Sequence, residues 1–144
     1  MLRGVQGTTA LNLDAKGRLA FPAKHRDALE DGKVVITAHP HGCLLIYSAP
    51  DWTPIRDQIQ RMPSLDIDSA SWKRLFIGYA EDEALDNAGR ILIAPSLRQY
   101  ARLEKQVWLV GQITYFELWS DAGWQQQLQP KLGAVPAGFE KLVL

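Results

Sequence analysis

The sequence LDAKGR occupies residues 13–18, and a near copy, LDNAGR, occupies residues 85–90. The leucine, aspartate, glycine and arginine recur at a fixed offset of 72 residues (13 to 85), and a later arginine recurs at the same offset as Arg26 and Arg98. A repeat of fixed period dictates the architecture of a chain. Two copies predict two similar units related by pseudo-twofold symmetry, rather than a solenoid of many units.

Each copy has the residues of a tight turn. Aspartate at the first position and glycine at the fourth are typical of a type I turn, in which the carboxylate can accept backbone N–H groups. Glycine supplies the positive φ that closes a short hairpin. We therefore interpret Asp14, Gly17, Asp86 and Gly89 as turn-organising residues, and we expect each turn to join the two strands of a hairpin.

Arginines follow both turns. Arg18 and Arg90 begin the returning strands, and Arg26 and Arg98 lie on short helices that a proline introduces. A guanidinium carries five donors that suit a phosphate or a guanine edge. Turn chemistry, with an arginine paired to the turn aspartate, explains the first residues of each motif. It does not explain why an arginine follows the turn in both copies, nor why a second arginine recurs eight residues later.

Composition places the chain among ordinary folded proteins. It has 144 residues, 47% of them hydrophobic and 22% charged, with a formal net charge of zero. It has no apolar run of about 18 residues, so no membrane span is predicted, and its first residues lack the apolar core of a signal peptide. A single cysteine, Cys43, excludes an internal disulfide. We expect a cytoplasmic protein.

Basic charge is concentrated in the first repeat. Residues 14–26 contain four basic residues against one acidic residue, and the equivalent residues 86–98 contain two against one. The difference arises because Ala88 and Ser96 stand where the first copy has Lys16 and Lys24. If the chain binds DNA, we expect the first repeat to contribute more of the charge.

Patterning predicts an α+β fold that is mainly β. Expected strands are 8–13, 18–21, 33–38, 43–47, 80–86, 90–94, 107–110 and 115–119, and expected helices are 22–30, 51–62, 72–79, 95–102 and 121–128. We divide the chain into a first repeat (1–62), a connecting segment (63–76), a second repeat (77–128) and a C-terminal tail (129–144). Units of about 60 residues are marginal alone, so we expect the halves to share one sheet system with interleaved hairpins.

The chain resembles the MraZ family of bacterial transcriptional regulators over nearly its whole length, up to about Leu128. The resemblance is carried by both turn motifs and their extensions: Arg3–Gly4, Leu13–Leu19, Leu85–Arg98, Val110–Gln112 and Phe116–Trp119. It implies a fold related to AbrB-type transition-state regulators. Two tandem AbrB-like swapped-hairpin units would then form a pseudo-twofold β-barrel with short flanking helices.

The resemblance also implies a function. It predicts a sequence-specific, DNA-binding repressor of the division and cell-wall gene cluster, which binds promoter direct repeats in double-stranded DNA as a ring-like homo-oligomer at the nucleoid. The family's Asp-x-x-x-Arg contacts correspond here to Asp14 with Arg18 and to Asp86 with Arg90. The DNA-binding candidates are Arg18, Arg90, Lys16, Lys24, Arg26 and Arg98.

Parts of the sequence are compatible with two other classes of function. His39, His41 and Cys43 could ligate zinc, but HPHG at 39–42 is typical of a turn, and its equivalent in the second half has no ligands. The acidic run Glu81–Glu83 fits a solvated strand face, and neither a phosphate loop nor a nucleophile elbow occurs. We expect no enzyme activity, metal, cofactor or small-molecule substrate. An antitoxin-like module that binds a protein partner is the alternative, because a fold alone does not determine function.

Overall fold

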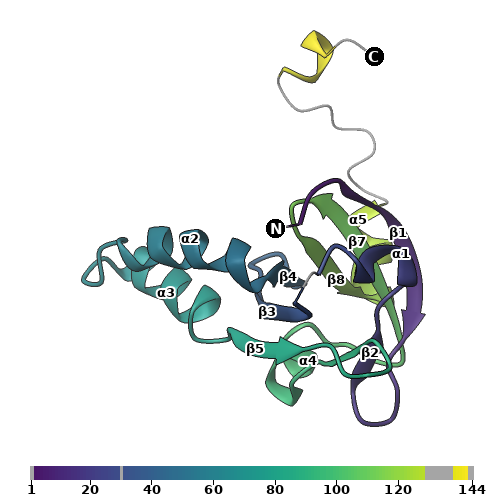
Figure 1. The fold of residues 1–144 in the computed structure, drawn as a ribbon. Coiled ribbons are helices and arrows are strands. Elements are labelled where there is room, and N and C mark those ends of the chain that lie inside the picture. The colour runs from purple at the N-terminus through teal and green to yellow at the C-terminus, as the bar shows by residue number, and fades with distance from the viewer. Residues whose placement is uncertain (1, 30, 129–137, 143–144) are drawn as a thin grey trace.

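The computed structural model describes residues 2–29, 31–128 and 138–142, and it is an α+β fold made mainly of strands (Figure 1). The strands are β1 (Val5–Asn12), β2 (Arg18–Ala20), β3 (Lys33–Ala38), β4 (Leu44–Ser48), β5 (Glu81–Ala84), β6 (Arg90–Leu92), β7 (Gln106–Ile113) and β8 (Phe116–Ser120). The helices are α1 (Ala23–Arg26), α2 (Ala49–Gln60), α3 (Ile67–Phe76), α4 (Pro95–Tyr100) and α5 (Asp121–Leu128), and Phe139–Lys141 forms a 3₁₀ turn.

One antiparallel sheet contains six strands in the order β1–β7–β8–β4–β3–β5. The order is symmetric, because each strand and its counterpart in the other half lie at equal distances from the centre. The central pair aligns Leu44 with Leu118 and Ile46 with Phe116, a register that exchanging the two halves leaves unchanged. The fold therefore has the pseudo-twofold symmetry that the repeat predicts.

The outer strands are exchanged between the halves. β1 of the first half pairs with β7 of the second, and β5 of the second half pairs with β3 of the first. β2 and β6 pair with each other as a separate two-stranded sheet. Thus the halves share one sheet system, as predicted.

Each predicted turn closes a minimal hairpin, in which the N–H of Asp14 donates to the carbonyl of Arg18 at 3.0 Å and the N–H of Asp86 donates to the carbonyl of Arg90 at 2.8 Å. Beyond the first turn, strand pairing with the segment before it is limited to a single bridge between Leu13 and Leu19. The pairing partner of Leu19 is Ile91, and both side chains are completely buried. Burial of this apolar pair on the pseudo-twofold axis accounts for strands that pair across the axis rather than across the turn.

The prediction of a closed barrel is wrong for the described residues. β1 and β5 are opposite edges of an open sheet, and no ladder of hydrogen bonds joins them. The chain leaves each edge strand through a turn into β2 or β6, and these strands use their hydrogen bonds on each other. The sheet consequently stays open, with the β2–β6 ribbon lying beside it (Figure 1).

Two helices differ from the prediction. α1 ends at Arg26, because the following bonds from Ala28 and Leu29 are tighter three-residue turns. α3 begins at Ile67 rather than at the predicted residue 72, because the Asp66 side chain accepts the backbone N–H of Ser69 at 3.0 Å as an N-cap. Helices α2 and α3 project together from the sheet (Figure 1). Residues 129–137 and 143–144 of the expected tail lie outside the described residues.

The main core lies beneath the β2–β6 ribbon. Leu19, Phe21, Ile91, Ile93 and Phe116 belong to one cluster and are at most 1% exposed. The two turns and their arginines are therefore attached directly to the most buried part of the fold.

Within the described residues, no helix is long and apolar enough to cross a bilayer.

Candidate nucleic-acid interface

The β2–β6 ribbon presents its two arginines on one face. Arg18 pairs with Leu92, and Ala20 pairs with Arg90, on either side of the buried Leu19–Ile91 pair. Side chains alternate along a strand, and directly opposed residues share a face. Arg18 and Arg90 are therefore diagonal neighbours on the solvent face, a relation that places Cβ atoms about 7–8 Å apart.

The first turn holds Arg18 at two points. One carboxylate oxygen of Asp14 accepts the backbone N–H of Lys16 at 2.9 Å and that of Arg18 at 2.8 Å. The other oxygen accepts Nε–H of the Arg18 guanidinium at 2.7 Å. The turn closes with the N–H of Gly17 donating to the carbonyl of Asp14 at 3.0 Å. Asp14 thus fixes both the backbone and the side-chain direction of Arg18.

The second turn repeats this arrangement. Asp86 accepts backbone N–H groups of Ala88 and Arg90, both at 2.9 Å, and Nε–H of Arg90 at 2.9 Å. The side chains of Arg18 and Arg90 are 31% and 34% exposed. Among the described residues, the bonds of these two side chains engage Nε, which leaves the outer edge of each guanidinium toward solvent.

The turn geometry lowers the pKa of both aspartates. For Asp14 the largest cause is the backbone N–H of Arg18, and for Asp86 it is the backbone N–H of Arg90. A carboxylate that accepts backbone N–H bonds is favoured in its charged form. Both turns are therefore organised around ionised aspartates at neutral pH.

These shifts predict an acid limit for the turns. Because the folded-state pKa of each aspartate lies below its ordinary value of 3.8, its stabilising contribution is complete above pH 3.8 and is lost as pH falls through the lower folded-state pKa. We expect ¹³C NMR titration of the side-chain carboxyls to give midpoints below 3.8 for Asp14 and Asp86. Arg18→Ala should preserve much of the Asp14 shift, since the backbone N–H stays; a wild-type midpoint at or above 3.8 would contradict this geometry.

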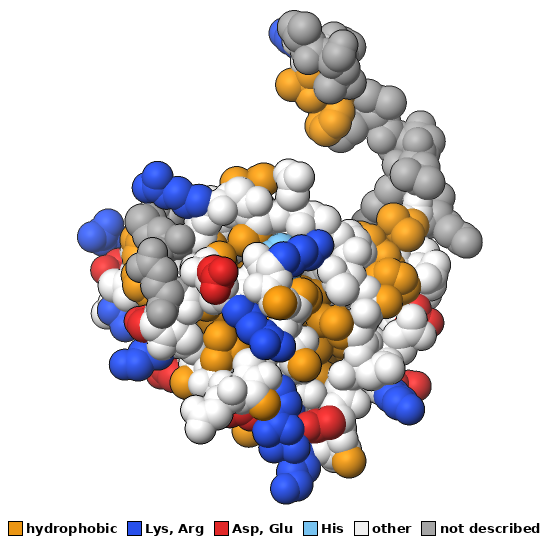
Figure 2. Space-filling view, turned by 45° about the vertical axis from the view of Figure 1, so that its right-hand side comes forward, with side chains coloured by type: hydrophobic (Ala, Val, Ile, Leu, Met, Phe, Trp, Pro, Cys, Tyr) orange, Lys and Arg blue, Asp and Glu red, His pale blue; other side chains and the backbone are white. Residues whose placement is uncertain are grey.

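The other candidates are distributed around the ribbon. Lys16 is exposed on the first turn, and Arg98 reaches the same turn from α4. Arg26 reaches the second turn from α1. Lys24 is not brought to the ribbon pair, because it lines a separate pocket with Arg3 near the start of β1. Figure 2 shows Lys and Arg side chains spread over one face of the molecule, with acidic side chains beside them at its lower end.

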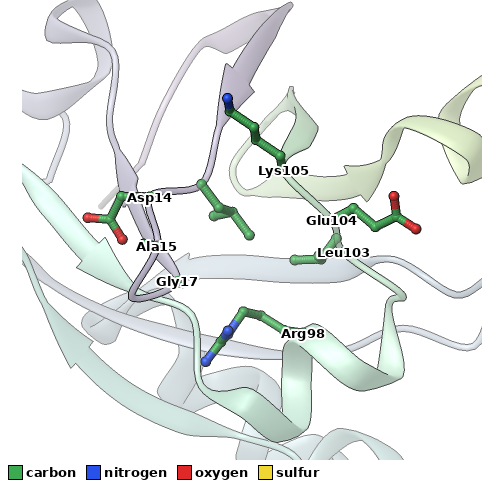
Figure 3. A pocket seen from close by; sticks show the side chains of 8 residues that line it. Asp14, Ala15, Gly17, Arg98, Leu103, Glu104 and Lys105 are labelled. Atoms are coloured by element: carbon green, nitrogen blue, oxygen red, sulfur yellow. The ribbon is translucent and has the colours of Figure 1, made fainter.

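A pocket lies between the first turn and the segment after α4 (Figure 3). Its wall contains Lys105, a basic residue that the sequence did not identify as a candidate, together with the acidic Glu104. The carbonyl of Lys105 accepts the N–H of Leu13 at 2.8 Å, which ties this segment to the turn. Nothing in the local sequence around 105 indicates this contact, because it depends on the exchange of β1 and β7 between halves.

The histidine turn has the features of a structural element. The N–H of His39 donates to the carbonyl of Cys43, and the N–H of His41 donates to Nδ1 of His39 at 3.1 Å. Cys43 is completely buried, and burial raises the pKa of its thiol to about 12. In the described ranges, no group of three or more His, Cys, Asp or Glu residues is placed to hold a metal ion.

Comparison with known proteins points to the same family in both halves of the chain. The sequence model of one family, described as "MraZ protein, putative antitoxin-like", matches residues 5–75 and again residues 76–134. The chain is similar to proteins named transcriptional regulator MraZ. The Aromatoleum aromaticum protein is 59% identical over 96% of this chain and 99% of the relative, and the Azoarcus sp. protein is 57% identical over the same shares. The Verminephrobacter eiseniae protein is 43% identical over 94% and 96%. Transcriptional regulators are not an enzyme class.

Proposed function

The chain belongs to the MraZ family of transcriptional regulators, and we propose that it is a sequence-specific DNA-binding repressor of the division and cell-wall gene cluster, acting on promoter direct repeats at the nucleoid. The observation that carries the proposal is the placement of Arg18 and Arg90 on one solvent face of a two-stranded ribbon. The major groove of B-DNA admits a two-stranded β-ribbon.

The ribbon arginines read base edges in this proposal. The diagonal relation of Arg18 and Arg90 aims two guanidinium groups at neighbouring base pairs, and Arg is the side chain best suited to a bidentate contact with guanine. Leu92, 39% exposed on the same face, offers an apolar surface for a thymine methyl group. Asp14 and Asp86 restrict the arginine side chains beforehand, which lowers the entropy lost on binding.

Basic residues outside the ribbon pair complete the set of DNA-binding candidates. Lys16 and Lys24 contact phosphates and supply affinity that carries little sequence information and falls with salt, and Arg26 and Arg98 lie against the two turns. Lys16 and Lys24 have no basic equivalent in the second half, so the first half contributes more to this term. A chain of zero net charge can bind DNA in this way, because the distribution of charge matters more than its sum.

Self-association completes the proposal. The α2–α3 projection exposes Leu65 fully, Ile67 by 81% and Trp72 by 46%, and an exposed apolar patch is typical of a protein–protein contact. A ring-like homo-oligomer would present several ribbons to repeated DNA boxes and gain affinity through effective concentration. The same patch favours the second candidate function, an antitoxin-like module that binds a protein partner.

Binding to duplexes from the region upstream of its own gene tests the function. We expect saturable binding of the wild-type protein to a duplex with one direct-repeat box, tighter binding to a duplex with two boxes, and a linear fall of log affinity with log salt. Fluorescence anisotropy measures affinity, and sedimentation velocity reports the oligomer. An intact oligomer that binds neither these duplexes nor a shuffled duplex at low salt would contradict DNA binding and favour the protein-partner function.

A further inference from the structure

The peptide that precedes each ribbon arginine is held by the opposite half. The carbonyl of Gly17 accepts the N–H of Ile93 at 2.9 Å, and the carbonyl of Gly89 accepts the N–H of Phe21 at 3.0 Å. The other end of each peptide, the N–H of the arginine itself, donates to the turn aspartate. Each peptide plane is thus fixed from both sides, once by its own half and once by the other.

A guanidinium from the opposite half covers each turn glycine. A Cβ atom built on Gly17 would lie 2.6 Å from Cζ and Nε of Arg98, and one built on Gly89 would lie 2.5 Å from Cζ and Nε of Arg26. Both glycines are buried and have positive φ angles, +80° and +75°. Glycine is therefore required at these positions for its conformation and also for the close approach of the arginine.

Each covering arginine is anchored on the residue that holds the turn. Nε–H of Arg98 donates to the carbonyl of Ile93 at 2.8 Å, and Nε–H of Arg26 donates to the carbonyl of Phe21 at 2.8 Å. Ile93 thus connects Arg98 to Gly17 through its two backbone groups. Figure 3 shows the Arg98 side chain leaving α4 and extending under the turn that carries Gly17.

We propose that Arg26 and Arg98 are crossed positioning residues: Arg98 fixes the direction of Arg18, and Arg26 fixes the direction of Arg90. This inference rests on the proposed DNA-binding function and extends it. Its consequence is that neither ribbon arginine is placed by its own half alone. The two halves then read DNA as a coupled pair.

Arg26 and Arg98 could instead contact phosphates directly. A substitution that keeps the positive charge distinguishes this role from positioning. Arg98→Lys keeps a cation but lacks the planar group and the Nε–H that lie over Gly17. A phosphate contact should survive this change with a loss of roughly twofold, whereas a positioning role should lose about as much as in Arg98→Gln. We expect both variants to weaken binding to the promoter box by roughly five- to twentyfold.

A double-mutant cycle on DNA affinity tests the crossing. We expect Arg98→Gln to add less than about twofold to the loss already caused by Arg18→Ala, because its effect passes through Arg18. The losses of affinity from Arg98→Gln and Arg90→Ala should be additive. Arg26→Gln should add little to the loss caused by Arg90→Ala, and its loss should be additive with that of Arg18→Ala. Additive behaviour in all four pairs, or coupling within each half, would overturn the proposal.

A second cycle needs no DNA and remains decisive if the function differs from the one proposed. Gly17→Ala should lower Tm by roughly 3–10 °C, because it combines a strained φ with the clash against Arg98. Adding Arg98→Ala should restore part of this loss, and adding Arg26→Ala should restore none. Equal rescue by both, or rescue by neither, would show that Arg98 does not cover the first turn in solution.

Discussion

Replacing both ribbon arginines, Arg18→Ala with Arg90→Ala, is expected to weaken binding to the promoter repeat by about 30- to 20,000-fold. The range follows from about 1–3 kcal/mol for each bidentate contact to guanine and a tenfold change for every 1.4 kcal/mol. The turns should keep their shape, because Asp14 and Asp86 still accept the backbone N–H groups at positions 16, 18, 88 and 90. Fluorescence anisotropy at one fixed salt concentration measures the loss.

Arg56→Ala provides the matched control for this double variant. Arg56 is an exposed arginine on α2 that pairs with Asp57 at 3.5 Å, so its loss removes a positive charge away from the ribbon. We expect its affinity to stay within about twofold of wild type, since an exposed ion pair of this kind contributes little. If the double variant kept both the wild-type affinity and the preference for promoter over shuffled DNA, the ribbon would not be the reading element.

Local chemistry explains why the turns could be predicted. The side chains of Asp14 and Asp86 accept backbone N–H groups at most four positions away, so these turn-forming roles are encoded in short stretches of sequence. The repeat itself predicts symmetry, because two similar sequences form two similar substructures. Residue patterning predicted the fold class, and the small size of each half predicted a sheet shared between the halves.

The pairing of strands could not be predicted in the same way. A hairpin across the first turn and an exchange with the second half place the same alternating residues inward, so the sequence pattern is identical for both. The choice depends on burying Leu19 against Ile91, which lie 72 positions apart. The barrel was expected from the family resemblance, and in the described residues β1 and β5 remain open edges because β2 and β6 pair with each other.

The residues of the site could be predicted from the sequence only in part, for a related reason. The recurrence of Arg26 and Arg98 indicated that they matter, but not that each lies against a glycine of the other half. Lys105 carried no signal at all, since its proximity to Leu13 arises from the pairing of β1 with β7. Contacts that cross the pseudo-twofold axis become evident only when the exchange of strands is known.

The core beneath the ribbon differs between the two halves. Phe116 is completely buried, and its ring packs edge-on against Phe21 with centroids 5.2 Å apart and against His25 at 4.9 Å. Its counterpart in the first half, by the 72-residue offset, is the smaller Leu44. The aromatic cluster therefore supports the second turn specifically, because it includes Phe21, whose N–H donates to the carbonyl of Gly89.

Phe116→Ala is expected to lower the free energy of unfolding by about 3–5 kcal/mol, because it removes a large buried ring and leaves a cavity. Urea denaturation followed by tryptophan fluorescence measures the change, and Arg56→Ala, at an exposed position on α2, should stay within about 0.5 kcal/mol of wild type. We also expect the variant to change the pKa of the neighbouring His25. Burial is the main cause that lowers the pKa of His25, followed by the charge of Lys24, so water entering the cavity should raise the pKa toward its ordinary value of 6.5.

The imidazole signals of His25 therefore report whether the cavity forms where the ring packed. An upward shift of the His25 pKa in Phe116→Ala, measured by ¹H NMR, would link the loss of stability to this cluster. Because Phe21 connects the cluster to Gly89, we expect the backbone amide of Arg90 to move as well, while that of Arg18 stays close to its wild-type position. A stable variant with an unchanged His25 would mean that Phe116 does not support the second turn, and that the crossed contacts hold it alone.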